Sequence, residues 1–368
     1  MKTVTSVDVV STHVAAPPNP PIRVSFHAVR EARNDVRLMR AATALVAVGY
    51  VVSIVDITVD RSQSAEEYLH DIHFQHVNIP DWQTSRRFEP LFFVKAVQAL
   101  LRSTMRLLRD KADVYHASDL NALPASCLAA LLRRKPLVVE VYDLQFPAPE
   151  TAIGFWRRLS RLLTYFHALV LPRCAAVIAT SPLHAQEIRN RFHIPEVLLL
   201  RNILSYQPVG KSDRLRRLLC LGPNVRIALY QGGVQPDRQL NRLISAALFL
   251  ERDIVIVMMG RSAGETQAQL EALIASEGVA DRVKIIPPVP YEELLDWTAS
   301  ADIGLIIYTP GYSLNVQTCL PNKLFEFLMA GLPVLASQLE ASTGRPAMRY
   351  SKSLLGRHVC TFSEQPGV

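Results

Sequence analysis

Short apolar runs alternate with helical patterns along most of this chain, and that alternation limits its fold more than any other feature. In the first half the apolar runs cover residues 22–26, 51–57, 113–116, 137–141 and 176–180, with helical patterns at 36–48 and 122–132. Gly49 follows the first helical pattern and is typical of a helix end. Repeated β-α-β units of this kind build mostly parallel sheets.

The second half repeats the same rhythm after an irregular, polar segment at 201–213. Its apolar runs cover 226–231, 254–259, 283–286 and 303–307, and its helical patterns cover 240–250, 265–276 and 291–299. A chain of 368 residues is too long for one ordinary core. The sequence therefore predicts an α/β protein with two Rossmann-like domains, 22–205 and 214–340. Ligands of such sheets bind beyond the carboxyl ends of the strands, which favours a cleft between facing domains.

The charge balance favours an anionic partner, because 40 Lys and Arg against 33 Asp and Glu leave a net charge of +7. Nucleic acid is not expected, since no zinc-ligand spacing, RNP-like motif or recognition helix accompanies the charge. Five scattered cysteines without a C-x-x-C pair indicate a reducing, cytoplasmic protein.

Two helical patterns, 90–109 and 155–171, mix large apolar side chains with arginines. A basic amphipathic helix can lie on an anionic membrane surface, and an ordinary domain helix with a solvated arginine face is the alternative. No run approaches the roughly 18 apolar residues of a membrane span. We expect a cytoplasmic protein that is soluble or peripheral on the inner membrane face.

The stretch at 320–337, LPNKLFEFLMAGLPVLAS, predicts a helix that begins near Asn322, ends at Gly331 and leads into a buried strand. Glu326 lies in the middle of this helix among apolar residues, where a carboxylate is costly to bury without a hydrogen-bond partner. Two interpretations are open. Ligand hydroxyls satisfy a buried Glu326, or Glu326 is partly exposed and pairs with Lys323.

Glycine turns follow two of the predicted strands. Gly232 and Gly233 follow the first strand of the second half, where their backbone can approach a ligand and donate N–H groups to an anion. Arg238 adds a positive charge, and Gly260 forms a second turn at the same sheet edge. The alternative is a pair of plain turns and a solvated arginine. Neither half contains G-x-G-x-x-G, which argues against a nicotinamide-dependent dehydrogenase.

Four segments in order, YQGGVQPDRQL, VMMGRS, VKIIPPVPYEELLDWTASADIGLIIY and LPNKLFEFLMAGLPVLAS, resemble the donor half of family 4 glycosyltransferases of GT-B fold. The N-terminal half resembles the family more loosely, so the likeness extends over residues 22–337. It implies a sugar transferase with a GT-B architecture, in which two Rossmann-like domains face each other across a cleft.

The resemblance also implies the site. Glu326 is expected to bind the ribose hydroxyls of a nucleoside-diphosphate sugar, and Arg238 to neutralise the leaving phosphate; these two residues are the expected catalytic pair. The other residues expected to bind the donor are Gly232, Gly233, Gly260, Val289, Pro290, Asn322 and Lys323. Transfer is expected to retain the anomeric configuration onto a saccharide or lipid-linked acceptor. No metal and no cofactor are expected, since the helix dipole and basic side chains supply the electrostatics.

Some positions depart from the family pattern. On the acceptor side, His116, Ser118 and Asp119 stand where the family often has His-x-His, so the second histidine is missing. Thr318 replaces the first glutamate of the usual pair. Gly233 occupies a position that is often basic, which leaves Arg238 as the basic residue of the turn.

Residues 341–368 do not follow the family pattern, and we interpret them as an atypical or truncated tail without the usual crossing helix. Two alternatives to an active transferase therefore stay open. One is an inactive protein that binds nucleotide sugars or a partner. The other is a sugar-nucleotide epimerase, which is disfavoured because the expected acid and base residues are not evident.

Overall fold

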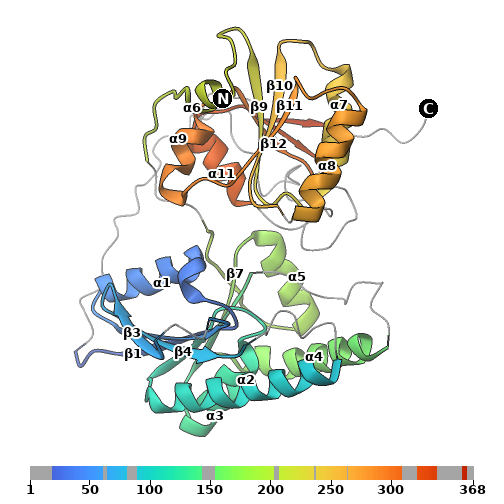
Figure 1. Ribbon diagram of the computed structural model, residues 1–368. Helices are drawn as coiled ribbons and strands as arrows, with labels where there is room; N and C mark the ends of the chain where they lie inside the picture. Colours follow the sequence, from blue (N-terminus) through green and yellow to red (C-terminus); the bar gives the residue numbers. More distant parts are fainter. Residues whose placement is uncertain are drawn as a thin grey trace, which may run out of the picture. The chain divides into compact units, whose positions relative to one another are not determined.

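The computed structural model describes two compact units (Figure 1). Unit 1 comprises Met1–Ala179 and Ala185–Leu200, and unit 2 comprises Thr180–His184 and Arg201–Val368. The described residues are 19–60, 64–80, 89–142, 154–202, 207–235, 238–262, 264–308, 321–337 and 359–362. Thr318 and most of the tail at 341–368 lie outside these ranges.

Unit 1 is built on an eight-stranded sheet in the order β3-β4-β2-β1-β5-β6-β7-β8. Every pairing in it is parallel except that of β3 with β4. The strands are β1 (Arg23–Ala28), β2 (Val51–Thr58), β3 (Glu66–Leu69), β4 (Ile72–Asn78), β5 (Val114–Ala117), β6 (Leu137–Val141), β7 (Ala176–Ala179) and β8 (Leu198–Leu199).

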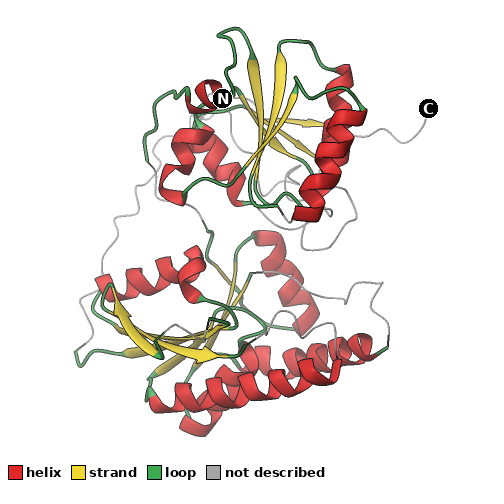
Figure 2. Cartoon of the chain, viewed as in Figure 1, coloured by secondary structure: helices red, strands yellow, loops and turns green. Residues whose placement is uncertain are grey.

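Helices cover both faces of this sheet, as the β-α alternation predicts (Figures 1 and 2). α1 and α5 lie on one face, and α2 and α3 on the other. The helices of unit 1 are α1 (Val36–Ala47), α2 (Glu89–Arg109), α3 (Leu123–Arg133), α4 (Phe155–Val170) and α5 (Pro182–Phe192).

Local sequence explains where α1 begins and ends. The carboxylate of Asp35 accepts hydrogen bonds from the N–H groups of Arg37 and Leu38, which caps the first turn. Gly49, with φ of 91°, follows the last turn. Leu38 and Ala42 then pack against the buried side chains of β1, β2 and β4.

The hairpin of β3 and β4 is absent from the sequence prediction. Its turn uses His70 and Asp71, which adopt φ of 51° and 61°. Two-residue hairpin turns need such positive φ values and usually contain glycine or Asn-Gly, so this turn lacks its usual signal. β3 is also an edge strand with alternating exposed positions, and its charged residues hide the apolar alternation.

Unit 2 is built on a six-stranded parallel sheet in the order β11-β10-β9-β12-β13-β14. The strands are β9 (Arg226–Gln231), β10 (Ile254–Met259), β11 (Val283–Ile286), β12 (Ile303–Ile306), β13 (Val334–Ser337) and β14 (Val359–Phe362). The alternation of the second half predicts five of them. β14 belongs to the tail and pairs in parallel with β13.

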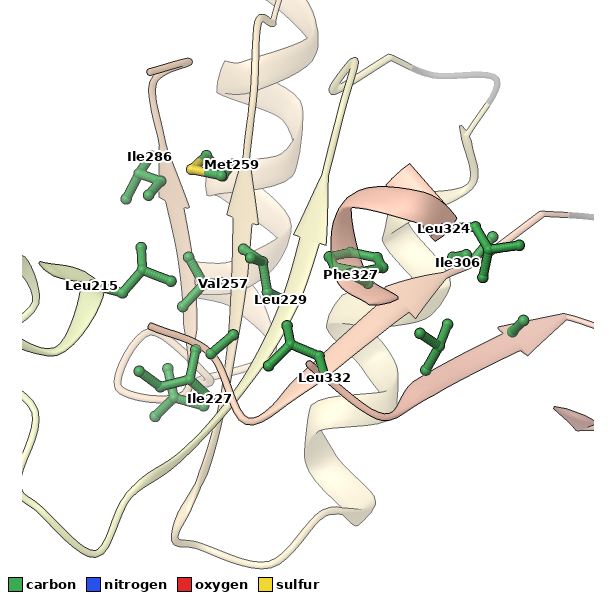
Figure 3. Close-up of a cluster of buried hydrophobic side chains, with 14 residues drawn as sticks. Leu215, Ile227, Leu229, Val257, Met259, Ile286, Ile306, Leu324, Phe327 and Leu332 are labelled. Carbon is green, nitrogen blue, oxygen red and sulfur yellow. The ribbon is translucent and has the colours of Figure 1, made fainter. Parts of the chain in front are cut away.

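Two hydrophobic cores lie on opposite faces of this second sheet. One packs against α7 (Leu240–Ala246) and α8 (Gly264–Ser276). The other packs against α6 (Arg214–Leu218), α9 (Leu294–Thr298) and α11 (Asn322–Met329), and Figure 3 shows Phe327 and Leu324 of α11 directed into it.

Residue 304 on β12 is a glycine, and its lack of a side chain allows α11 to approach the sheet. A Cβ atom built on Gly304 would lie 2.4 Å from the ring of Phe327, which is fully buried. The ring therefore fills the space that any other residue at position 304 would need. This contact positions the helix that carries Glu326.

We predict that Gly304→Ala destabilises unit 2, because the new methyl group forces Phe327 out of its place in the core. Overpacking of this kind costs about 1–3 kcal/mol. Gly264→Ala is the matched control, because a Cβ there meets no atom within 4 Å. Thermal denaturation measures both, and equal melting temperatures for the two variants would contradict the prediction.

Unit 1 buries a carboxyl group on β6. Glu140 is 5% exposed, and burial raises its pKa from the ordinary 4.5 to about 7, although the Arg37 charge opposes the shift. A carboxyl whose pKa is higher in the folded state holds its proton longer there than in the unfolded chain. Folding stability is therefore lost as the pH rises from about 4.5 through 7.

We predict that Glu140→Gln removes this loss of folding stability at high pH. The variant should exceed the wild type by about 2–3 kcal/mol in free energy of unfolding at pH 8 and should show little gain at pH 4. Denaturant titrations across this pH range measure the difference. Glu196→Gln, at an exposed position, serves as the control. A difference between Glu140→Gln and wild type that stays constant with pH would refute the prediction.

No described helix combines the length and the apolar character that crossing a bilayer requires.

Candidate functional site

The glycine turns that follow β9 and β10 are joined to each other at the carboxyl edge of the sheet. The N–H of Gly232 donates to the carbonyl of Met259 at 3.0 Å, and Val234 forms a parallel bridge with Ser262. A Cβ on Gly260 would lie only 1.8 Å from the carbonyl oxygen of Gly232. Position 260 therefore has to be glycine for the two turns to approach this closely.

The backbone of the first turn is only partly available to a ligand. The N–H of Gly232 is already bound by Met259, and the carbonyl of Gly233 accepts a hydrogen bond from the Tyr230 hydroxyl at 3.0 Å. Within the described residues, the N–H of Gly233 has no acceptor. The sequence predicts N–H donation from both glycines, and the structure restricts it to Gly233.

Two cationic side chains gather beside this turn. The Lys323 ammonium lies 4.1 Å from the centre of the Tyr230 ring, and it contacts the space where a side chain at Gly232 would be. Lys323 and Arg238 each lie 5.5 Å from the centre of the Tyr308 ring. The family resemblance implies both Arg238 and Lys323 as donor-side residues, and the fold brings both to the Tyr308 ring.

Glu326 is 7% exposed, so the interpretation that it is partly exposed is wrong. The side-chain amide of Gln231, at the end of β9, donates a hydrogen bond to its carboxylate. The carbonyl of the same amide accepts a hydrogen bond of 2.9 Å from the Thr298 hydroxyl of α9. Gln231 thus supplies part of the compensation that a buried carboxylate requires, and it holds the carboxylate in place.

The other predicted donor residues lie in unit 2 at separate points. Asn322 is exposed in the first turn of α11, and its side-chain oxygen accepts from Asn202 at 3.1 Å. Val289 packs against the core cluster beneath α9, and Pro290 is exposed just before a short 3-10 helix. Their roles in donor binding stay predictions.

Unit 1 contains a cavity of about 890 Å³ at the carboxyl ends of β1, β2, β5 and β6. Its walls come from these strand ends and from α2, α3 and α4. The residues that line it are His27, Val29, Arg30, Glu31, Asn34, Ile57, Val59, Phe92, Phe93, Ala96, Val97, Ala99, Leu100, Ser103, Asp119, Leu120, Asn121, Pro124, Ala125, Tyr142, Leu159 and Leu163.

The structure separates the residues predicted for the acceptor side. Asp119 lines the cavity, and its carboxylate accepts from the Ala122 N–H at 2.8 Å, where α3 begins. His116 does not line the cavity; it stacks on Phe26 at 4.5 Å between ring centres, and burial lowers its pKa to about 4. Ser118 is buried, and its N–H donates to the carbonyl of His27.

His27 is a polar residue of this cavity that the sequence prediction misses. Its ring is 2% exposed, and its Nδ1 lies 2.9 Å from the carbonyl oxygen of Ala122, so Nδ1 carries a proton and donates it. Burial lowers the pKa of the ring, which favours the neutral form. The one available signal is a single histidine inside an apolar strand, and most such residues are structural.

The model of glycosyltransferase family 4 matches residues 35–202 of this chain. A D-inositol 3-phosphate glycosyltransferase from Streptosporangium roseum is 30% identical over 145 residues, which is 35% of this chain and 33% of the relative. The protein of the same name from Streptomyces avermitilis is 26% identical over 185 residues, covering 45% of this chain and 38% of the relative. The matches thus span about a third of the length of these curated relatives.

Solved structures share the fold over most of the chain. Sucrose-phosphate synthase from Thermosynechococcus elongatus has a TM-score of 0.65 at 16% identity, covering 86% of this chain and 82% of that one. Anabaena HepE, solved with UDP and glucose, has a TM-score of 0.62 at 15% identity, with 88% and 82% covered. At these identities the likeness shows the fold alone.

Residues 35–202 thus match the model of glycosyltransferase family 4, and the two-sheet fold of the chain is that of the GT-B glycosyltransferases.

Proposed function

We propose that this chain transfers a sugar from a nucleoside-diphosphate sugar to a hydroxyl group of an acceptor. The proposal rests on one group of residues in unit 2. The carboxyl edge of β9 brings together a glycine turn with an available N–H, two cations and a buried carboxylate held by Gln231. These groups match the diphosphate and ribose of one donor molecule.

Each part of the donor has a partner in unit 2. The carboxylate of Glu326 accepts hydrogen bonds from the ribose hydroxyls, and the N–H of Gly233 donates to a phosphate oxygen. Arg238 and Lys323 stabilise the negative charge that grows on the leaving diphosphate, which is the electrostatic role that a metal ion fills elsewhere. We therefore propose metal-independent transfer.

We further propose that the anomeric configuration is retained, as the family resemblance implies. The leaving phosphate then accepts the proton of the acceptor hydroxyl on the same face of the sugar. A pair of protein carboxylates on opposite sides of the bond, as in hydrolases, is not required. Cations beside the phosphate serve this route because they stabilise the leaving group without competing for the proton.

The related proteins support a uridine nucleotide as donor. Anabaena HepE was solved with UDP-glucose, and an E. coli structure named for trehalose-6-phosphate was solved with UDP-2-fluoro glucose. The sequence relatives are named for D-inositol 3-phosphate, which makes a cyclic polyol one candidate acceptor. A saccharide or a lipid-linked acceptor is the broader proposal, and unit 1 is the unit that would bind it.

We predict that Glu326→Ala weakens binding of UDP-glucose, measured by calorimetry, by about 10- to 100-fold. That range corresponds to the loss of a charge-assisted hydrogen bond to the ribose. Glu326→Gln keeps the side-chain volume and should fall between wild type and Glu326→Ala.

Glu271→Ala on α8 is the control, because this exposed glutamate lies on the opposite face of the sheet and should leave binding unchanged. Unchanged affinity in Glu326→Ala would contradict the donor assignment. Binding of the donor without transfer to any acceptor would instead support the inactive nucleotide-sugar binding protein.

We also propose that α2 and α4 of unit 1 contact an anionic membrane surface. Leu101 and Met105 of α2 and Leu162 and Tyr165 of α4 are all more than half exposed. Arg157 and Arg158 at the start of α4 are exposed as well. Exposed apolar side chains next to arginines suit the interface between lipid tails and anionic head groups.

The protein should therefore float with liposomes that contain phosphatidylglycerol and should not float with neutral ones. Replacing Arg157 and Arg158 by glutamine should reduce flotation, because each basic residue near the surface contributes about 1 kcal/mol. Replacing Arg216 and Arg217 of unit 2 by glutamine is the control. Absence of flotation with anionic liposomes would end this proposal.

A further inference from the structure

Tyr308 follows β12 at the carboxyl edge of the sheet of unit 2, and neighbouring elements fix its position. Its N–H donates to the hydroxyl of Ser337, the last residue of β13, at 3.0 Å. Its half-buried side chain packs against the hydrophobic cluster that contains Leu324 and Phe327 of α11. The backbone and the ring of Tyr308 therefore both occupy a defined place at the sheet edge.

Two cations from distant parts of the sequence lie against this ring. Arg238 precedes α7, and its guanidinium carbon lies 5.5 Å from the centre of the Tyr308 ring. Lys323 belongs to the first turn of α11, and its ammonium nitrogen also lies 5.5 Å from that centre. A cation is attracted to the face of an aromatic ring within about 6 Å of its centre. Tyr308 is thus close enough to attract both cations.

Lys323 is also held by a second ring, that of Tyr230. Its ammonium lies 4.1 Å from the centre of this ring, which is 1% exposed. The Tyr230 hydroxyl in turn donates to the Gly233 carbonyl. The ammonium lies 3.4 Å from the place that a Cβ atom would take at Gly232. The two rings together place the Lys323 charge at the glycine turn that follows β9.

An aromatic ring positions cations in a way that suits an anion-binding site. A carboxylate at position 308 would also attract Arg238 and Lys323, but it would cancel part of their charge and repel a phosphate. The ring attracts through its quadrupole and carries no net charge. Both cations therefore keep their full charge while their long side chains are held in place. Ordering such side chains before the ligand arrives lowers the entropy that binding costs.

We propose that Tyr308 is a positioning residue of the donor site, whose ring holds Arg238 and Lys323 at the diphosphate of the nucleotide sugar. It acts through the two cations and does not touch the reacting atoms. The ring keeps its contact with both cations when the donor binds, so its contribution persists in the complex. This role rests on the proposed function, because it concerns the donor that unit 2 is proposed to bind.

Calorimetry with UDP-glucose tests the role of the ring. Tyr308→Leu keeps an apolar side chain without the ring and should weaken UDP-glucose by about 5- to 30-fold, as expected for two cation–π contacts. Tyr308→Phe keeps the ring and should stay within about twofold of the wild type. An unchanged affinity in Tyr308→Leu, or an equal loss in Tyr308→Phe, would overturn the proposal.

Phe249→Leu is the matched control for the loss of a ring in unit 2. Phe249 is 88% exposed and follows Ala247, which packs in the core on the face of the sheet opposite α11. This substitution should leave the affinity for UDP-glucose unchanged. A loss as large as that in Tyr308→Leu would contradict a specific role for Tyr308.

Uridine separates the positioning of the cations from damage to the fold. It carries the base and the ribose but no phosphate, so Tyr308→Leu should change its affinity by less than about twofold in ligand-detected NMR titrations. An equal loss for uridine and UDP-glucose would mean that the substitution disrupts unit 2 as a whole. That result refutes the positioning role.

The electron density of the ring gives the sharpest readout. Phenylalanine with one, two or three ring fluorines at position 308 withdraws density from the ring face step by step, which weakens a cation–π contact with little change in shape. The affinity for UDP-glucose should fall at each step and approach that of Tyr308→Leu. A constant affinity would indicate packing alone, and a rising affinity would indicate that the cations leave the ring on binding. Either result refutes the proposal.

The wild-type titration distinguishes this role from the proposed function. If the wild type binds UDP-glucose and the Tyr308 variants match it, the positioning role alone is rejected. If the wild type binds neither UDP nor UDP-glucose, the proposed function is rejected and the role of Tyr308 falls with it.

Discussion

Unit 2 depends on how one carboxylate is buried. Glu326 lies in α11, which packs against β12, and its carboxylate is tolerated there because the side-chain amide of Gln231 donates to it. The same amide accepts from Thr298, so β9, α9 and α11 meet at a single hydrogen-bonded group. Breaking a buried network of this kind leaves polar groups unpaired on several elements at once.

That network needs a close approach of helix and sheet, which Gly304 makes possible. Without a side chain on β12, the Phe327 ring lies against the strand and brings Glu326 to the end of β9. Lys323, one turn earlier, then reaches the Gly232 turn and the Tyr230 ring. Core packing and electrostatics are therefore coupled, since one apolar contact positions a carboxylate and a cation at the same edge of the sheet.

The polar side chains of unit 1 differ in whether they have hydrogen-bond partners. Asp35 caps α1, and Asp119 accepts a hydrogen bond from the N–H of Ala122, the residue before α3. Nε2 of His27 and Oγ of Ser103 lack partners within the described residues, and both residues belong to the lining of one cavity.

Much of this fold follows from local pattern. The bounds of β6, β9, β10 and β11 coincide with mostly apolar runs, because helices cover both faces of each parallel sheet. The helix that carries Glu326 was also predicted, since Asn322 and Gly331 mark its ends. The β3-β4 hairpin was missed because His70 and Asp71 form its turn in place of the usual glycine.

The candidate site was predicted less completely, because residues far apart in sequence create it. The family resemblance named Arg238, Lys323 and Glu326 for the donor, but no local pattern could show that Gln231 would hold Glu326. His27 was missed because its unpaired Nε2 is defined by Ala122, 95 positions away, and by the walls of a cavity.

The sequence by itself determined the alternation of strands and helices, the helix ends and the family resemblance, because these depend on neighbouring residues along the chain. Only the tertiary structure decided which polar groups are paired, which cations converge and where a cavity remains. Hydrogen bonding, burial and charge depend on distances across the fold, and those distances are set when the helices pack on the sheets.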